Sequence, residues 1–219
     1  KPGMAFLPEV QALKGHVDRV FEMLENPPEK VKLKICVTGP YTLSAAFSYR
    51  DAELLRQLGH ALRQLTAANL FRQRRLETAI LALDEPVFGV LDDPLLDYGA
   101  EGREALREAW EAIFSEAKAR GVETLLHLHD TRNELFWEIE NLDIVESHVG
   151  DALYRSEKVR EKLARTGKKL KVSLAVTDYD MLIKAKLEAG GSRLAGETAE
   201  QLIGRVWASL KKGEVKPEE

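Results

Sequence analysis

The feature that most constrains the fold is the alternation of short apolar segments with longer segments of helical periodicity. The apolar segments that predict strands are 31–38, 78–83, 123–128, 143–146 and 170–176. Each is followed by residues that predict a helix, and a further helix precedes the first strand. Because parallel neighbouring strands need a crossover connection, this alternation predicts βαβ units and a parallel sheet.

The predicted helices carry apolar stripes with a spacing of three or four residues. Asp51 is placed to cap the first helix after a strand, and a leading helix over 10–24 ends before Pro27. The two clearest stripes are Leu54, Leu55, Leu58, Leu62 and Leu65, and then Ala105, Leu106, Ala109, Trp110, Ile113 and Phe114. Each stripe predicts a helix that packs one face against a sheet.

Five βα units are fewer than the eight that close a barrel. The predicted fold is α/β, of the (β/α)8 TIM-barrel type, incomplete in this chain because terminal strands are missing. We expect residues 1–219 to form one barrel domain from a longer chain, with the remaining strands supplied by that chain or by a partner. The alternative is an open, doubly wound sheet, which needs fewer strands, but its Gly-rich phosphate fingerprint is not found here.

Composition excludes several classes of function. The formal net charge is −4, with acidic and basic residues mixed along the sequence, so no basic patch for nucleic acid is expected. No apolar run approaches the roughly 18 residues of a membrane span, and we expect a cytoplasmic protein. The single cysteine, Cys36, excludes an internal disulfide and is expected to be a small buried side chain in its strand.

Polar residues gather where the predicted strands end. His127 and His129 are two residues apart and therefore share one face of a strand, as do Glu146 and His148 on the next strand. Adjacent strands lie about 4.8 Å apart, so side chains from both can converge. His127, His129 and Glu146 are the predicted zinc ligands, which leaves an open coordination position. The alternative is that these histidines form ordinary hydrogen bonds in a polar barrel mouth.

Two more strand ends carry carboxylates. Asp84 and Glu85 end an apolar strand, where a carboxylate can bind a substrate ammonium group or orient a metal-ligating histidine. The alternative is a salt bridge to a nearby arginine such as Arg74 or Arg75. Asp180, near the fifth strand end, is placed either to act as a general acid or base or to cap the next helix.

These strand-end motifs resemble the catalytic domain of cobalamin-independent methionine synthases, which share a barrel superfamily with uroporphyrinogen decarboxylase and the corrinoid methyltransferases. The order and spacing agree from about Val31 to Glu219. The motifs are Thr38-Gly39-Pro40-Tyr41-Thr42, Leu83-Asp84-Glu85-Pro86-Val87, His127-Leu128-His129, Val145-Glu146-Ser147 and Ala175-Val176-Thr177-Asp178-Tyr179-Asp180.

The resemblance implies a methyltransferase with a zinc-activated thiol substrate such as homocysteine. It implies Glu146 as a zinc ligand and Asp84 as the residue that holds the amino group of the substrate. Thr42 and Glu85, in the first and second motifs, are the other predicted substrate-binding residues. Asp180 stands where the family has a proton-donating histidine, and is the predicted catalytic residue.

The chain also departs from the family pattern. His-Leu-His replaces the family's His-x-Cys, so the zinc pair is either His127 and His129, or His129 with Thr131 at the cysteine position. Ala46 stands where the family has a tryptophan that faces the pterin. The resemblance therefore implies methylcobalamin or a related corrinoid as the methyl donor, and a corrinoid protein as a possible partner.

Two other functions remain open at this level. One is a metal-free enzyme that acts on tetrapyrrole carboxylates, which needs arginines at the barrel mouth, and few are predicted there. The other is a non-catalytic barrel that binds a corrinoid or a partner protein, which the replaced ligand positions favour.

Overall fold

The computed structural model describes residues 6–90, 92–173, 179–189 and 198–212. The chain divides into two compact units, Lys1–Leu174 (unit 1) and Ala175–Glu219 (unit 2), which we describe one at a time. The expectation of one domain over 1–219 stays a prediction.

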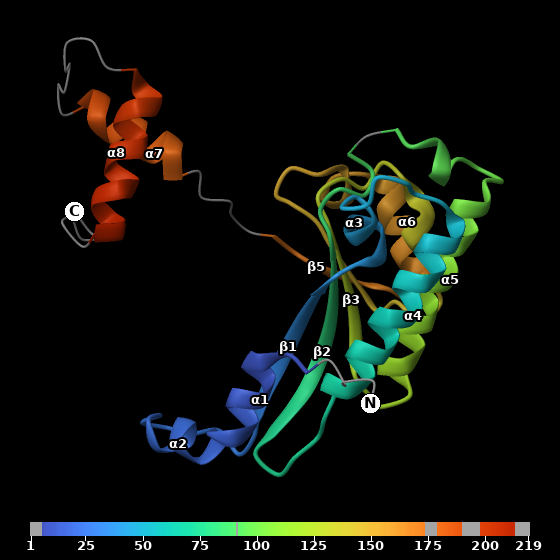
Figure 1. Ribbon diagram of the computed structural model, residues 1–219, viewed down its shortest axis with the longest axis horizontal. Helices are drawn as coiled ribbons and strands as arrows, with labels where there is room; N and C mark the ends of the chain where they lie inside the picture. Colours follow the sequence, from blue (N-terminus) through green and yellow to red (C-terminus); the bar gives the residue numbers. More distant parts are fainter. Residues whose placement is uncertain (1–5, 91, 174–178, 190–197, 213–219) are drawn as a thin grey trace. The chain divides into compact units, whose positions relative to one another are not determined.

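Unit 1 is a mixed α/β structure built around a parallel sheet (Figure 1). Its five strands lie side by side in sequence order, β1-β2-β3-β4-β5. They are β1 (Val31–Thr38), β2 (Leu76–Glu85), β3 (Glu123–Leu128), β4 (Ile144–Glu146) and β5 (Lys169–Lys171). All four neighbouring pairs are parallel. The prediction of an α/β fold with parallel βα units is confirmed at this level.

The helices of unit 1 connect and flank these strands. They are α1 (Pro8–Gly15), α2 (Val17–Glu22), α3 (Pro40–Ser44), α4 (Ala52–Asn69), α5 (Glu101–Lys118) and α6 (Glu157–Thr166), with 3-10 turns η1 (Pro94–Leu96), η2 (Glu134–Glu138) and η3 (Ala152–Tyr154). The prediction of one continuous leading helix over 10–24 was wrong. Gly15 is a poor helix former, and His16, with φ −123° and ψ 19°, separates α1 from α2.

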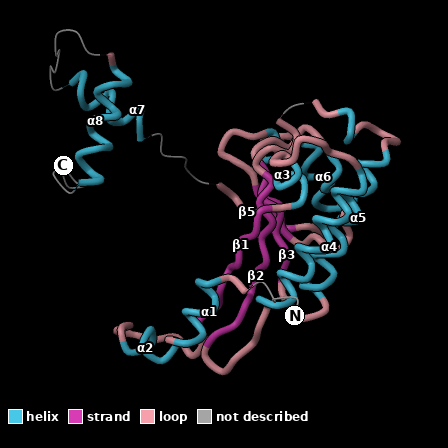
Figure 2. The backbone as a smooth tube through the Cα atoms, viewed as in Figure 1, coloured by secondary structure: helices cyan, strands magenta, loops and turns pink. Residues whose placement is uncertain are grey.

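Helices α4, α5 and α6 lie on the same side of the sheet (Figures 1 and 2). The predicted stripe of α5 is buried throughout, and the side chain of Asp51 accepts a hydrogen bond from Leu54 N at 2.7 Å, as a helix cap does. Gly59 of α4 packs directly on α5, since a Cβ there would lie 2.5 Å from Ala109 Cβ. The two helices therefore approach closely and form one layer over the sheet.

The two faces of the sheet differ in what they bury. Alternate residues point toward the helices and belong to the main core; among them are Ile35, Val37, Leu81, Leu83, Leu126 and Val145. The opposite face holds a small separate cluster of Ala82, Leu125 and Ile144, with Ile80 packed against it. Cys36 is exposed, so the prediction that it is buried was wrong. Its neighbour Val37 takes the position toward the helices instead.

The sheet curls toward this second face, which we call the concave face. Lys34 on β1 forms an ion pair with Glu146 on β4, with Nζ 3.6 Å from Oε2. Two strands separate β1 from β4 in the sheet order. At about 4.8 Å between neighbours, those strands would lie roughly 14 Å apart in a flat sheet. The ion pair across the face therefore requires curvature.

Unit 2 contains the helices α7 (Tyr179–Ala189) and α8 (Ala199–Lys212). The last amphipathic helix predicted from the sequence is confirmed as α8. Trp207 Nε1 on α8 donates a hydrogen bond to Asp180 Oδ1 on α7 at 2.7 Å. Part of the fifth predicted strand, 174–176, lies outside the described residues. In the described part of the chain, no helix combines the length and apolar character needed to cross a membrane.

Candidate metal centre

A row of polar residues crosses the carboxyl ends of the strands. The sheet register aligns Thr38 with Asp84, Asp84 with His127, His127 with Glu146, and Glu146 with Lys171. Residues in register on parallel strands point to the same face. One residue earlier, each strand contributes a side chain to the opposite, helix-covered face. The row therefore lies on the concave face, at the edge where α/β folds hold their functional groups.

Three histidines converge at this row. His127 is the next-to-last residue of β3, His129 comes two residues after His127, and His148 comes two residues after the end of β4. Their nearest ligand nitrogens all lie within 4.8 Å of one another. The ring centroids of His129 and His148 are 4.0 Å apart, and that of His127 lies 5.2 Å and 5.4 Å from them. This cluster, His127, His129 and His148, could hold a metal ion.

A carboxylate orients the first of these rings. His127 Nδ1 lies 2.7 Å from Asp84 Oδ1. Because a carboxylate accepts hydrogen bonds, Nδ1 is the donor in this contact, which leaves Nε2 as the nitrogen that can bind a ligand. A metal-ligating histidine commonly donates its other ring N–H to a carboxylate in this way. The sequence predicted Asp84 as a substrate-binding residue or a support for a histidine, and the observed contact is the second arrangement.

The other two rings also suit metal binding. His148 Nε2 is buried and has no hydrogen-bond partner among the described residues. A buried polar atom without a partner is unfavourable, and a bound cation would remove that cost. Burial lowers the pKa of His129, and the neighbouring His148 and His127 lower it further, against an opposing effect of Asp84. The neutral imidazole, which is the form that ligates metals, is thereby favoured.

Glu146 makes a different set of contacts from those the sequence predicted. It forms ion pairs with Lys171 and with Lys34, and its side chain is 13% exposed. Burial acts to raise the pKa of Glu146, but the hydrogen bond from Lys171 and the charges of both lysines lower it on balance. The cluster of potential ligands contains His148 and does not include Glu146. Its role as a zinc ligand stays a prediction.

Glu85 and Thr42 were predicted to bind substrate; the structure places Glu85 at the end of β2 and Thr42 in α3, where the two are hydrogen-bonded. Glu85 has no exposed surface, and it accepts hydrogen bonds from Tyr41 N, Thr42 N and Trp110 Nε1 at 3.1, 2.7 and 2.9 Å. A Cβ on Gly39 would come within 2.3 Å of this carboxyl group, so the backbone lies directly against it. Glu85 thus ties α3 and α5 to β2 from inside the core.

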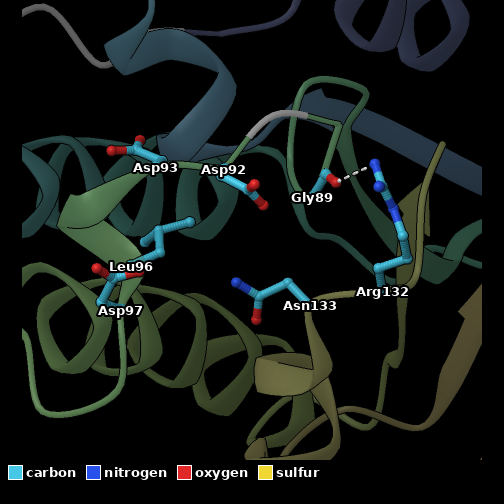
Figure 3. A pocket seen from close by; sticks show the side chains of 7 residues that line it. All are labelled: Gly89, Asp92, Asp93, Leu96, Asp97, Arg132 and Asn133. Atoms are coloured by element: carbon cyan, nitrogen blue, oxygen red, sulfur yellow. Dashed lines mark hydrogen bonds between the residues drawn. The ribbon is translucent and has the colours of Figure 1, made fainter.

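A pocket of about 250 Å³ lies between the loops that follow β2 and β3 (Figure 3). Its lining residues are Gly89, Asp92, Asp93, Leu96, Asp97, Arg132 and Asn133. Arg132 joins the two loops, since its Nη2 donates to Gly89 O at 3.2 Å while its Nε pairs with Asp130 at 2.8 Å. Asp130 directly follows His129, so the pocket wall continues into the loop that carries the cluster.

Asp180, the predicted catalytic residue, lies in the first turn of α7 in unit 2. Its described partner is Trp207 of the same unit. Its catalytic role stays a prediction, and Asp178 lies outside the described residues.

Comparisons with known proteins do not identify a family. No protein-family model matches the chain, and no curated protein matches it. Among solved structures, the apo form of the 3-keto-D-glucoside 4-epimerase YcjR from E. coli aligns with 93% of this chain and 87% of its own. The identity is 10% and the TM-score 0.41, a likeness too weak to assign a fold or a reaction to this chain.

Proposed function

We propose that His127, His129 and His148 bind one zinc ion. The observation that carries this proposal is the convergence of three imidazoles at the ends of adjacent strands, with Asp84 orienting His127. Imidazole nitrogens are ordinary zinc ligands, and three protein ligands with an open fourth position are the arrangement of catalytic zinc sites. The buried Nε2 of His148, which has no hydrogen-bond partner within the described ranges, fits the same assignment.

The curvature of the sheet supports the proposal that the five strands belong to a (β/α)8-type barrel. On the concave face, Ala82, Leu125 and Ile144 are in register and form an apolar layer, and the polar row lies one level above them. Barrel interiors are filled by such layers of side chains, and their functional groups sit at the carboxyl ends of the strands. In such a barrel the three histidines would lie at the mouth.

The reaction we propose is transfer of a methyl group from a methylcorrinoid to a thiol such as homocysteine. Zinc lowers the pKa of a thiol that it binds, and so supplies a nucleophile at neutral pH. The proposal is supported by the histidine cluster together with the family resemblance of the strand-end motifs. Asp84, whose side chain is 43% exposed, is placed both to orient His127 and to meet a substrate amino group.

The test has two stages. Purified, chelator-washed protein is titrated with zinc, and the loaded protein is then assayed for methyl transfer from methylcobalamin to homocysteine. We expect one zinc ion per chain and transfer that depends on it. Stoichiometric zinc without transfer would reject the reaction and keep the metal site, while no zinc binding by a folded protein would favour a non-catalytic barrel.

Activation of water is a second candidate, favoured by the chemistry of the cluster. Histidine binds a metal through a neutral imidazole, so three histidine ligands would not offset the charge of the ion. Such a site also suits hydrolysis or hydration, in which the metal lowers the pKa of water. Zinc-dependent hydrolysis of an activated ester, without methyl transfer, would favour this candidate.

A further inference from the structure

We infer that Lys34 and Lys171 form a binding site for the anionic group of a small thiol substrate, beside the histidine cluster on the concave face. The inference rests on the proposed zinc site, because it assigns the charge of the substrate that reaches that site. Neither lysine was singled out by the sequence, since a lysine within a strand is usually a solvated surface residue.

The two lysines reach one point from opposite edges of the sheet. Lys171 lies on β5, in register with Glu146, and pairs with its Oε1. Lys34 comes from β1, and its Nζ lies 3.6 Å from Glu146 Oε2. Because His127 is the register neighbour of Glu146 on the next strand, the carboxylate that both ammonium groups contact lies beside the strand that carries His127. Curvature of the sheet therefore assembles a basic site from the first and last strands.

The charges around Glu146 do not balance. Two ammonium groups share one carboxylate, which leaves one positive charge in excess. An ammonium group has three N–H donors, and in the described part of the chain each of these side chains pairs with Glu146. The side chains of Lys34 and Lys171 are 35% and 45% exposed, whereas that of Glu146 is 13% exposed. The unused donors are therefore accessible to a ligand.

These features fit a small carboxylate-bearing thiol. A lysine acts as a compact point charge, which suits a carboxylate that approaches from an open face. Adjacent strands lie about 4.8 Å apart, so two or three carbon atoms suffice to separate a thiol at the metal from a carboxylate at the lysines. A neutral thiol would gain nothing from this pair, and a cationic thiol would be repelled.

The experiment compares three small thiols on the cobalt-loaded protein, with the near-ultraviolet sulfur-to-cobalt absorption as the readout. The thiols are 3-mercaptopropionate, 2-mercaptoethanol and cysteamine, which carry a negative, no and a positive second charge. We expect the anionic thiol to bind about tenfold more tightly than the neutral one, and cysteamine, whose ammonium group Asp84 can receive, to gain nothing from the lysines. Lys34→Met and Lys171→Met should each reduce the preference, and the double variant should abolish it.

Two further variants separate this site from a purely structural ion pair. Lys169→Met is the matched control, because Lys169 lies on the same strand and pairs with Glu123; it should keep the preference. Glu146→Gln frees both ammonium groups, so it should strengthen binding of the anionic thiol without weakening cobalt binding. A merely structural role of the pair does not produce this gain.

The outcomes are distinguishable. Cobalt binding with equal affinity for all three thiols, or a preference that survives the double lysine variant, would overturn the anion site and leave the metal site standing. A loss of cobalt affinity in Glu146→Gln would indicate that Glu146 is a metal ligand. It would also overturn the assignment of Lys34 and Lys171 to anion binding. A folded protein that binds no cobalt would overturn both the metal site and this inference.

Discussion

The two faces of the sheet differ sharply, although consecutive residues of the same strands make them. On the helix-covered face the strands place apolar side chains in the main core, and on the concave face the next residue of each strand is polar. The pairs are Val37 and Thr38, Leu83 and Asp84, Leu126 and His127, and Val145 and Glu146. Side chains of the main core and side chains of the proposed metal site thus occupy alternate positions, and single substitutions should separate effects on stability from effects on metal binding.

The largest effect is expected on the helix-covered face. Leu126 has no exposed surface, so Leu126→Ala should lower the free energy of unfolding by about 2–5 kcal/mol, through lost burial and the cavity left behind. Zinc affinity of the folded protein should change little. Urea unfolding of the metal-free protein and zinc titration measure the two quantities. A large loss of zinc affinity in the folded variant would show that the helix-covered face contributes to zinc binding as well as to stability.

On the concave face a substitution should change zinc affinity more than it changes the free energy of unfolding. His129→Ala removes one of three ligands from an exposed position, so zinc affinity should fall by at least about a hundredfold, more than a supporting residue costs. The free energy of unfolding without metal should shift by less than about 1 kcal/mol, as for other exposed sites. Competition with a chromophoric chelator measures the affinity. Unchanged affinity would remove His129 from the site.

A smaller effect is expected from the residue that orients His127. Asp84→Asn keeps the size of the side chain but removes its charge, and zinc affinity should fall by about 10- to 100-fold. Thr38, its register neighbour on β1, provides the matched control: Thr38→Val should leave zinc affinity unaltered. Equal losses of zinc affinity in both variants would indicate a general disturbance of the carboxyl end of the sheet rather than loss of the Asp84–His127 contact.

The smallest effect concerns pH and Glu85, which is buried on the helix-covered side at the end of β2. Burial raises the pKa of Glu85, although hydrogen bonds from Thr42 and Trp110 oppose this. The fold therefore favours the protonated form, and the contribution of Glu85 to stability is present at low pH and decreases as pH rises from the ordinary carboxyl range toward the raised pKa.

Glu85→Gln removes this titration. The free energy of unfolding of the unsubstituted protein, minus that of the variant, should become smaller as pH rises through that window. Chemical unfolding at a series of pH values measures the difference. A difference that grows with pH would mean that the fold favours the ionised carboxylate.

Much of the architecture follows from local sequence patterns. The strands at Val31–Thr38 and Glu123–Leu128 have the predicted boundaries, because alternating or fully apolar segments have few other ways to bury their side chains. The stripe around Trp110 likewise predicts its helix and its buried face. The break at His16 was missed, because the apolar spacing continues across it and hides a weak helix former.

The candidate site was predictable in part. The spacing of His127 and His129 placed two candidate ligands on one face, but the sequence did not single out His148 as a third. The contact of Glu146 with Lys34, which lies more than a hundred residues earlier, was not predictable either, because it forms only where the sheet curls. Such long-range contacts leave no signal in local periodicity.

The most direct test of the central claim is zinc K-edge X-ray absorption of the protein loaded with one zinc ion per chain. If the three histidines bind the zinc, we expect nitrogen or oxygen ligands at about 2.0–2.1 Å, multiple scattering from three imidazole rings and no sulfur ligand from the protein. His148→Ala should reduce the imidazole contribution to two rings. A spectrum without imidazole scattering, from a folded protein that has bound zinc, would contradict zinc binding by the three histidines.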